Sequence, residues 1–258
     1  MLQVRQLVKH FGGVHALDGV SFEVAPGECV ALIGPNGAGK STCFACLAGQ
    51  HAPTSGEIVW AGRHIETLPP AARLRLGVSR TFQVAQTFEA LTVRQNLQLL
   101  LGAGGGLPAW NVLERSHLDA AMGLLARVGL QEQAQLPVLS LPYGARKRLE
   151  LAMALVPVDA GAQARLLLLD EPAAGLAPSE RADLMRLVRS VARSDGAGPP
   201  MAVLYTEHNM DAVFGVADRV MVLIDGKLAA QGSPQEIARD PLVRSRYLGQ
   251  AAPGAGRA

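Results

Sequence analysis

The nine residues GPNGAGKST, Gly34–Thr42, decide the fold class of this 258-residue chain. They follow the apolar run CVALI, Cys29–Ile33, and precede a stretch that is compatible with a helix. A strand, a glycine-rich turn and a helix in this order, with the spacing G-x-x-x-x-G-K-[ST], form a loop that cradles the phosphates of a nucleoside triphosphate. The sequence therefore predicts an α/β domain that binds a nucleotide.

The residue types of this loop each have a physical reason. Gly34, Gly37 and Gly39 allow positive φ and turn backbone N–H groups toward phosphate oxygens, and the helix N-terminus adds partial positive charge. We expect Lys40 to place its charge at the β- and γ-phosphates and the Ser41 hydroxyl to ligate Mg²⁺. The predicted nucleotide-binding residues of the loop are Gly34, Asn36, Gly37, Gly39, Lys40, Ser41 and Thr42.

A second element, RLLLLDEP at Arg165–Pro172, places four leucines ahead of two carboxylates. A buried strand here would deliver Asp170 beside the phosphate loop to hold Mg²⁺ through water, and Glu171 would polarise an attacking water. The alternative is a strand that ends in a solvated acidic turn. The presence of GPNGAGKST in the same chain favours the catalytic interpretation.

Short β-rich runs separated by helical patterns favour an α/β domain with a mainly parallel core sheet and an antiparallel β edge. The runs are Val20–Val24, Cys29–Ile33, Leu166–Asp170, Met201–Tyr205 and Val220–Ile224. Both ends of the chain contribute strands. The core sheet is therefore expected to be assembled around a segment from the middle of the sequence.

That middle segment shows helix signals and little strand. Thr92 and Gln95 form a capping box, and His117–Val128 has the pattern of a helix stopped by Gly129. We predict one domain over residues 1–250, with a core of 1–84 and 158–250 and a helical lobe inserted at about 85–157. Residues 251–258 are predicted to be a disordered tail.

Composition argues against several classes of protein. A net charge of +2 gives no reason to expect a nucleic-acid-binding surface, and no apolar run approaches the roughly 20 residues of a membrane helix. The three cysteines are an odd number, which agrees with a reducing compartment. Cys43 and Cys46 form a CxxC pair without a second Cys/His pair nearby, and we interpret them as packing residues of a helix.

Taken together, these motifs resemble the ATP-binding subunits of ABC transporters, from Phe11 to Gly249. The resemblance rests on GPNGAGKST, LLLLDEP, RTFQ, VLYTEH and AAGLAP in this order. It implies that Gln83 contacts the metal at the lobe interface, that His208 contacts the γ-phosphate and the attacking water, and that Phe11 stacks on adenine. It also implies dimer contacts for Ala173–Leu176. Taken singly, each of these residues has an ordinary structural reading, so only their shared order supports the roles.

The segment LSLPYGARKR, Leu139–Arg148, called here the signature segment, departs from the Ser-Gly-Gly pattern that such subunits present to ATP on a partner. Pro142 and Tyr143 replace the serine and the first glycine, whereas Gly144 is retained. Because a glycine and a helix N-terminus are what allow close approach to a phosphate, we predict that Gly144 contacts the partner's ATP. The alternative is a Pro-Tyr-Gly turn that only starts a helix.

A narrower resemblance is carried by RTFQ, the Tyr-Gly pair, RLELA, EPAAGL, EHNM, GSPQEI and YLG. These are similar to the larger of the two ATPases that energise bacterial uptake of branched-chain and other hydrophobic amino acids. The resemblance implies ATP and Mg²⁺ as cofactors, transmembrane permease subunits, a second ABC ATPase in a heterodimer or homodimer, and, indirectly, a periplasmic binding protein. It implies a peripheral position on the cytoplasmic face of the inner membrane, a permease helix docked near Phe88, and no nucleic-acid partner.

Two other functions stay open at this point. A soluble ABC ATPase of nucleic-acid repair or translation usually has a second nucleotide domain or a long coiled-coil insertion, and neither is visible in the sequence. A non-hydrolysing nucleotide sensor is disfavoured by the presence of Glu171 and His208. Copurification with permeases and steady-state ATP hydrolysis distinguish these functions from the transport function.

Overall fold

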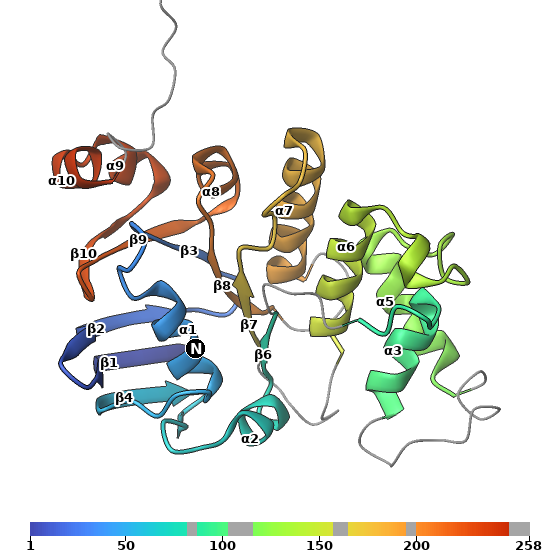
Figure 1. Ribbon diagram of the computed structural model, residues 1–258, viewed down its shortest axis with the longest axis horizontal. Coiled ribbons are helices and arrows are strands. Elements are labelled where there is room, and N and C mark those ends of the chain that lie inside the picture. Colours follow the sequence, from blue (N-terminus) through green and yellow to red (C-terminus); the bar gives the residue numbers. More distant parts are fainter. Residues whose placement is uncertain (82–86, 103–115, 157–164, 195–199, 248–258) are drawn as a thin grey trace, which may run out of the picture.

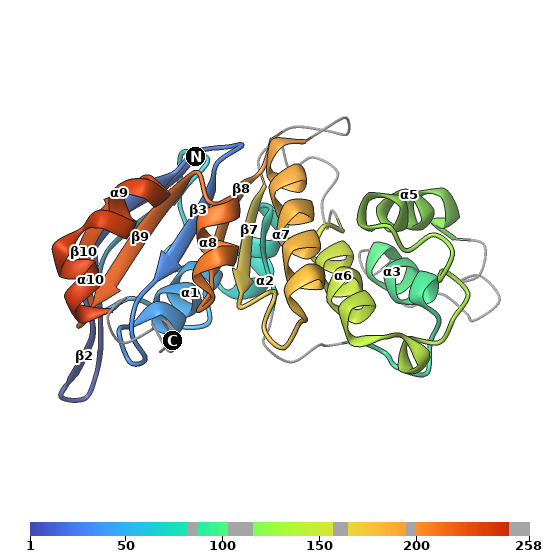
Figure 2. The same cartoon turned by 90° about the horizontal axis from the view of Figure 1, so that it is seen from above.

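The computed structural model describes residues 1–81, 87–102, 116–156, 165–194 and 200–247. In this part of the chain the strands form two sheets, and a group of helices lies at the end of the molecule away from β10 (Figure 1). Seen from above, α3 and α5 lie at the far end of the molecule from β10, with α6 between them and α7 (Figure 2). The two views agree that α3, α5 and α6 form a group at one end of the molecule.

The core sheet has the strand order β10-β9-β3-β8-β7-β6, and every neighbouring pair is parallel except β10 with β9. The four central strands, β9, β3, β8 and β7, carry side chains that are buried on both faces, which explains their nearly continuous apolar sequences. The strands are β3 (Cys29–Ile33), β6 (Val78–Arg80), β7 (Leu166–Asp170), β8 (Ala202–Thr206), β9 (Arg219–Ile224) and β10 (Lys227–Gly232).

The second sheet is antiparallel, in the order β2-β1-β4-β5. Its strands are β1 (Leu2–Phe11), β2 (Val14–Val24), β4 (Ser55–Trp60) and β5 (Arg63–His64). The pairing of β1 with both neighbours is interrupted by register shifts around Gln6, whose φ is 47°. Such bulges break the alternation of apolar and polar residues, and this explains why the sequence pattern revealed only the second half of β2.

The helices are α1 (Lys40–Ala48), α2 (Pro70–Arg75), α3 (Val93–Gly102), α5 (Leu118–Val128), α6 (Tyr143–Ala154), α7 (Pro178–Arg193), α8 (Met210–Val216), α9 (Pro234–Arg239) and α10 (Pro241–Arg246), with a 3₁₀ turn at Val138–Ser140. None of the helices within the described ranges has the length and hydropathy that a membrane crossing requires.

The predicted fold class is confirmed: a mainly parallel core sheet, an antiparallel sheet and a helical region are all present. In the middle segment, Thr92 and Gln95 exchange the two hydrogen bonds of a capping box, at 2.9 and 3.2 Å. The predicted helix at His117–Val128 begins one residue later, because His117 has a positive φ and precedes the first turn. The boundaries of the core and the lobe stay a prediction, and residues 251–258 lie outside the described part of the chain.

Two hydrophobic cores lie on the two faces of β3. Cys29, Ala31 and Ile33 pack into a core with α6, α7 and α8, whereas Val30 and Leu32 face a core shared with α1 and the antiparallel sheet. The strand before the phosphate loop is therefore held on both sides. The loop that follows it starts from a rigid support.

Arg73 of α2 stabilises the other end of the helix that follows the loop. Its guanidinium is buried and donates to the carbonyl oxygens of Cys46 and Leu47, at 2.5 and 2.8 Å, in the last turn of α1. It also donates to the carbonyls of Leu68 and Glu66. A cation is favourable at a helix C-terminus, where the last carbonyls have no partner within the helix.

We therefore expect Arg73→Met to lower the free energy of unfolding by about 3 kcal/mol, because several buried carbonyls lose their donor. Arg75→Met, an exposed change on the same helix, is the matched control and should cost well under about 1 kcal/mol. Urea titration of the two variants and the parent measures the difference. Equal stability of both variants would contradict this account of α1.

Candidate functional site

The phosphate loop connects β3 to α1 along a path that only glycine permits at two positions. Gly34 has φ 150°, and a Cβ added there would lie 2.0 Å from the carbonyl oxygen of Leu223. Gly39 has φ 101°, and its Cβ would lie 2.3 Å from the carbonyl oxygen of Ala16. The loop is thus wedged between β9 and β2, and any side chain at either glycine would displace it.

Lys40 begins α1 and its ammonium is buried within the loop. Its Nζ donates to the carbonyl oxygens of Gly34 and Pro35, at 2.7 and 2.9 Å. Burial lowers the pKa of the Lys40 ammonium, while the carboxylates of Glu171 and Asp170 act in the opposite direction. The side chain is therefore fixed in place by its own loop and lies in the field of two carboxylates.

A pocket of about 360 Å³ opens over the loop. It is lined by residues 36–42, by residues 14–16 at the start of β2, and by Glu171 and His208. Phe11 is not among its lining residues: the ring is 43% exposed and makes an edge contact with His51, the centroids 5.2 Å apart. Its stacking on adenine stays a prediction.

Asp170 ends β7 with its carboxylate held by two neighbours. Its Oδ1 accepts a hydrogen bond from Thr206 at 2.8 Å, and its Oδ2 forms an ion pair with Arg80 at 2.8 Å. The ends of β7 and β8 meet because Asp170 pairs with Thr206 in register. Arg80 comes from the adjacent strand β6 and also bonds to Gln50 behind the loop.

Glu171 and His208 form a hydrogen-bonded pair that faces the pocket. The distance from His208 Nε2 to Glu171 Oε1 is 2.9 Å. Glu171 has φ 47°, an uncommon backbone conformation for a non-glycine residue, and its N–H donates to Thr206 Oγ1 at 3.1 Å. Thr206 therefore holds both acidic residues, accepting from the backbone of one and donating to the carboxylate of the other.

Thr206, Arg80 and Glu207 belong to the site although the sequence pattern did not indicate them. Glu207 is buried, and burial raises the pKa of its carboxyl, although N–H donors act in the opposite direction. A signal existed for Thr206 and Glu207, since both lie beside His208 in VLYTEH. For Arg80 the signal was its place as the first residue of RTFQ, and Gln83 of the same motif lies outside the described residues.

The signature segment lies away from this pocket, at the start of α6. Pro142 is the N-cap of α6 and supplies no side-chain hydrogen bond to the first turn. Gly144 does not line the pocket, and a Cβ added to it would lie 2.8 Å from Glu180 Oε1 of α7. Gly144 therefore lies away from the phosphate loop of its own chain. This position is compatible with a role in the site of a partner subunit.

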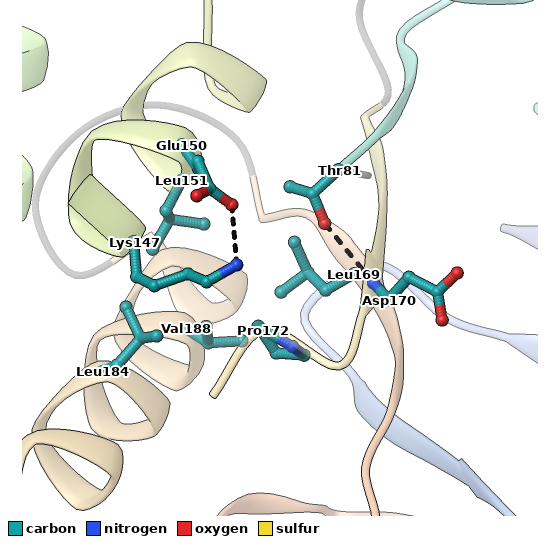
Figure 3. Close-up of a pocket in the computed structure, with 9 residues that line it drawn as sticks. All are labelled: Thr81, Lys147, Glu150, Leu151, Leu169, Asp170, Pro172, Leu184 and Val188. Carbon is teal, nitrogen blue, oxygen red and sulfur yellow. Dashed lines mark hydrogen bonds and ion pairs between the residues drawn. The ribbon is translucent and has the colours of Figure 1, made fainter. Parts of the chain in front are cut away.

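A second, much smaller cavity of about 10 Å³, room for about one water, lies between α6 and the end of β7. Lys147 and Glu150 form an ion pair at 3.1 Å on its α6 side, and the N–H of Asp170 donates to Thr81 on the other side (Figure 3). The carboxylate of Asp170 points away from this pair (Figure 3). The cavity therefore lies behind the nucleotide pocket and is not part of it.

The CxxC pair is buried in the core beneath the loop. Burial raises the pKa of the Cys46 thiol to about 11 and that of the Cys29 thiol to about 12, and it also raises the pKa of Cys43. Among the described residues, no group of three or more His, Cys, Asp and Glu is placed to hold a metal ion. The packing supports the structural interpretation of these cysteines.

Because a raised pKa keeps a thiol neutral, at pH 8 only roughly one Cys46 side chain in a thousand is the reactive thiolate. We expect a thiol reagent such as Ellman's reagent to modify the native protein very slowly at pH 8. In guanidinium chloride all three cysteines should react rapidly. A thiol that reacts within seconds in the native protein would show that this helix is open to solvent.

The fold and the pocket together define a nucleotide-hydrolysing cassette, and comparisons with known proteins agree. The sequence profile of the ABC transporter family matches residues 17–174, and the chain belongs to that family. It is an ATP-binding subunit and an ATPase of the ABC transporter class, as predicted from the sequence.

Similar proteins cover nearly the whole chain. The high-affinity branched-chain amino acid transport ATP-binding protein LivG of Salmonella typhimurium is 41% identical, over 97% of this chain and 98% of that protein. The corresponding protein BraF of Pseudomonas aeruginosa is 38% identical over the same shares. The crystal structure of MJ1267, an ATP-binding cassette of an ABC transporter, in its ADP conformation has a TM-score of 0.81 with 29% identity, over 96% of this chain and 98% of that one.

Proposed function

We propose that this chain hydrolyses ATP to drive the import of branched-chain amino acids. The observation that carries the proposal is the full-length similarity to LivG, combined with a pocket in which the phosphate loop faces the Glu171–His208 pair. The solute is inferred from the relatives alone, because the ATPase subunit of such a system does not contact the transported molecule.

ATP is proposed to bind with its phosphates on residues 36–42 and its base toward Phe11. Lys40 already lies in the loop with its charge directed by two carbonyls, so little rearrangement is needed to contact a phosphate. The hydroxyl of Ser41, which lines the pocket, is an oxygen ligand of the kind that Mg²⁺ prefers. The buried carboxylate of Asp170, whose oxygens bond Thr206 and Arg80, would act through water. These two residues and Gln83 would hold the cation, which would neutralise charge on the phosphates.

Glu171 is proposed as the general base for the attacking water. Its side chain reaches the pocket from the end of β7, and the hydrogen bond from His208 fixes its orientation. The backbone bond to Thr206 prevents the strained turn at Glu171 from relaxing. His208 is proposed to contact the γ-phosphate and the same water.

Glu171→Gln should keep the affinity for MgATP within about twofold and lower kcat by about 10²–10⁴-fold, since an amide cannot take the proton of water. Calorimetry measures the affinity, and phosphate release with the partner subunits measures kcat. Full hydrolysis by this variant would place the general base elsewhere.

Gly144 is proposed to contact ATP that is bound to a second ABC ATPase subunit, in a heterodimer or a homodimer. The first turn of α6 receives no hydrogen bond from the side chain of its N-cap, Pro142, so its N–H groups are available to an anion. A side chain at residue 144 would meet Glu180 within the same chain. Bulk and charge at this position must therefore be tested separately.

Gly144→Asp should abolish dimerisation driven by ATP, because a carboxylate would meet the partner's phosphates, at a cost of several kcal/mol. Affinity of the single subunit for MgATP should stay near normal. Gly144→Ala is the matched control for bulk against Glu180, and Pro142→Ser should be tolerated. Light scattering with and without ATP measures assembly. If Gly144→Asp dimerises like the parent, the signature segment is only a turn.

The permease subunits are proposed to dock beside the start of α3. Phe88 and Leu139 are 55% and 64% exposed, and the backbone at Leu139 donates to the carbonyl of Glu89, so the two side chains belong to adjacent segments. Arg146 bridges the segments by contacting Glu89 and the carbonyl of Leu139. Docking here would place the chain on the cytoplasmic face of the inner membrane, with a periplasmic binding protein on the other side.

Reconstitution with candidate permeases in vesicles tests the function as a whole. Uptake of leucine, isoleucine or valine that requires both ATP and this chain supports the proposal. A rate of ATP hydrolysis that is unaffected by permeases but is changed by nucleic acid would favour a repair or translation ATPase. Binding of ATP without hydrolysis in any assembly would favour a nucleotide sensor.

A further inference from the structure

Tyr143 connects the signature segment to the loop that follows Glu171. Its hydroxyl donates to the carbonyl oxygen of Ala174 at 3.2 Å. The ring passes so close to Gly175 that a Cβ there would lie 3.2 Å from Tyr143 Cε1, and Gly175 has φ 77°. The ammonium of Lys147 lies 5.6 Å from the ring centroid. The tyrosine therefore packs on Ala174 and Gly175, although half of its surface is exposed.

Glu207 connects the same loop to His208. Its Oε1 accepts the N–H of Ala173 at 3.0 Å, and its Oε2 accepts the N–H of His208 at 3.2 Å. The carboxyl is buried, so water does not compete for these bonds. One side chain thus fixes the spacing between the loop and the backbone of the histidine.

The two connections meet at Glu171. His208 contacts the Glu171 carboxylate at 2.9 Å, and the N–H of Ala174 donates to the Glu171 carbonyl at 3.1 Å. A continuous set of contacts therefore leads from Tyr143 through Ala174, Ala173, Glu207 and His208 to Glu171, all within one chain. We call this set the relay.

We propose that Tyr143 and Glu207 are positioning residues through which the signature segment sets the geometry of the Glu171–His208 pair in its own subunit. The inference rests on the proposed function, in which Gly144 meets the partner's ATP. When that ATP presses on the first turn of α6, the tyrosine transmits the displacement to the loop, and Glu207 transmits it to His208. Hydrolysis in one site is thereby coupled to occupancy of the other.

The test is a double-mutant cycle on the complete assembly with its partner ATPase and permeases. Tyr143→Phe removes only the hydroxyl and should lower kcat about two- to tenfold, and Glu207→Gln, which loses one acceptor, about ten- to hundredfold. KM for ATP, and calorimetric affinity of the single subunit, should change less than about twofold. Because both residues act through one relay, the double variant should be no slower than Glu207→Gln alone.

Two control variants make the same chemical changes, tyrosine to phenylalanine and glutamate to glutamine, at positions outside the relay. Tyr205→Phe deletes a hydroxyl that donates to the carbonyl of Val213 at 3.3 Å, and Glu236→Gln alters a carboxylate that accepts the N–H of Ser233 at 2.7 Å. Both should leave kcat within about twofold of the parent. If the controls lower kcat as much as the relay variants do, the losses reflect general destabilisation, and the proposal is overturned.

Amide hydrogen exchange on the nucleotide-free single subunit gives a second readout that does not depend on hydrolysis. Tyr143→Phe and Glu207→Gln should both accelerate exchange in Ala173–Leu176, and Glu207→Gln should also do so at His208, whereas the controls should not. Unchanged exchange, or losses in kcat that multiply in the double variant, would overturn the relay and leave the ATPase function intact. A parent assembly that does not hydrolyse ATP would instead overturn the proposed function. The hydrogen-exchange measurement would still test the relay in that case.

Discussion

The site depends on the in-register pairing of three parallel strands. Thr206 of β8 pairs with Leu32 of β3 on one side and with Asp170 of β7 on the other. Parallel strands end at the same edge of a sheet, so the segments that leave them arrive together. The phosphate loop, Glu171 and His208 follow these three strand ends, and a slip of one residue in either pairing would separate them and turn buried side chains to the wrong face.

Burying charge at this edge is costly, and the structure compensates each group with a specific partner. Asp170 is held by Arg80 and Thr206, and the ammonium of Lys40 is held by two loop carbonyls. Glu207 is held by backbone N–H groups. A buried charge without a partner would cost several kcal/mol, so these contacts allow a charged site to exist inside an apolar sheet.

The signature segment combines one position that keeps the family pattern with two that have changed. Pro142 has the extended backbone of an N-cap but no hydroxyl, and Gly144 and the helix N-terminus are retained. The tyrosine between them replaces a flexible glycine with a ring that packs on the loop after Glu171. The segment thus lacks a serine hydroxyl and has a hydrogen bond to another part of its own chain. Sequence comparison alone presents the same change as decay of a motif.

The sequence by itself determined the local features whose cause is local. GPNGAGKST predicted the phosphate loop because glycines, a lysine and a following helix produce it within nine residues. Short β-rich runs separated by helical patterns predicted the mainly parallel sheet. The capping box at Thr92 was predicted for the same reason, since its two partners lie three residues apart.

Only the tertiary structure decided which distant groups meet. The bonds from Thr206 to Asp170 and Glu171, the ion pair of Arg80, and the link from Tyr143 to Ala174 join segments whose approach depends on strand register and helix packing. No periodicity in one segment encodes its distance from another. The antiparallel strands were also largely hidden, because bulges near Gln6 interrupt their pattern. The residues of the phosphate loop and the two carboxylates could therefore be predicted from the sequence, whereas the groups they contact depend on the packing of the whole chain.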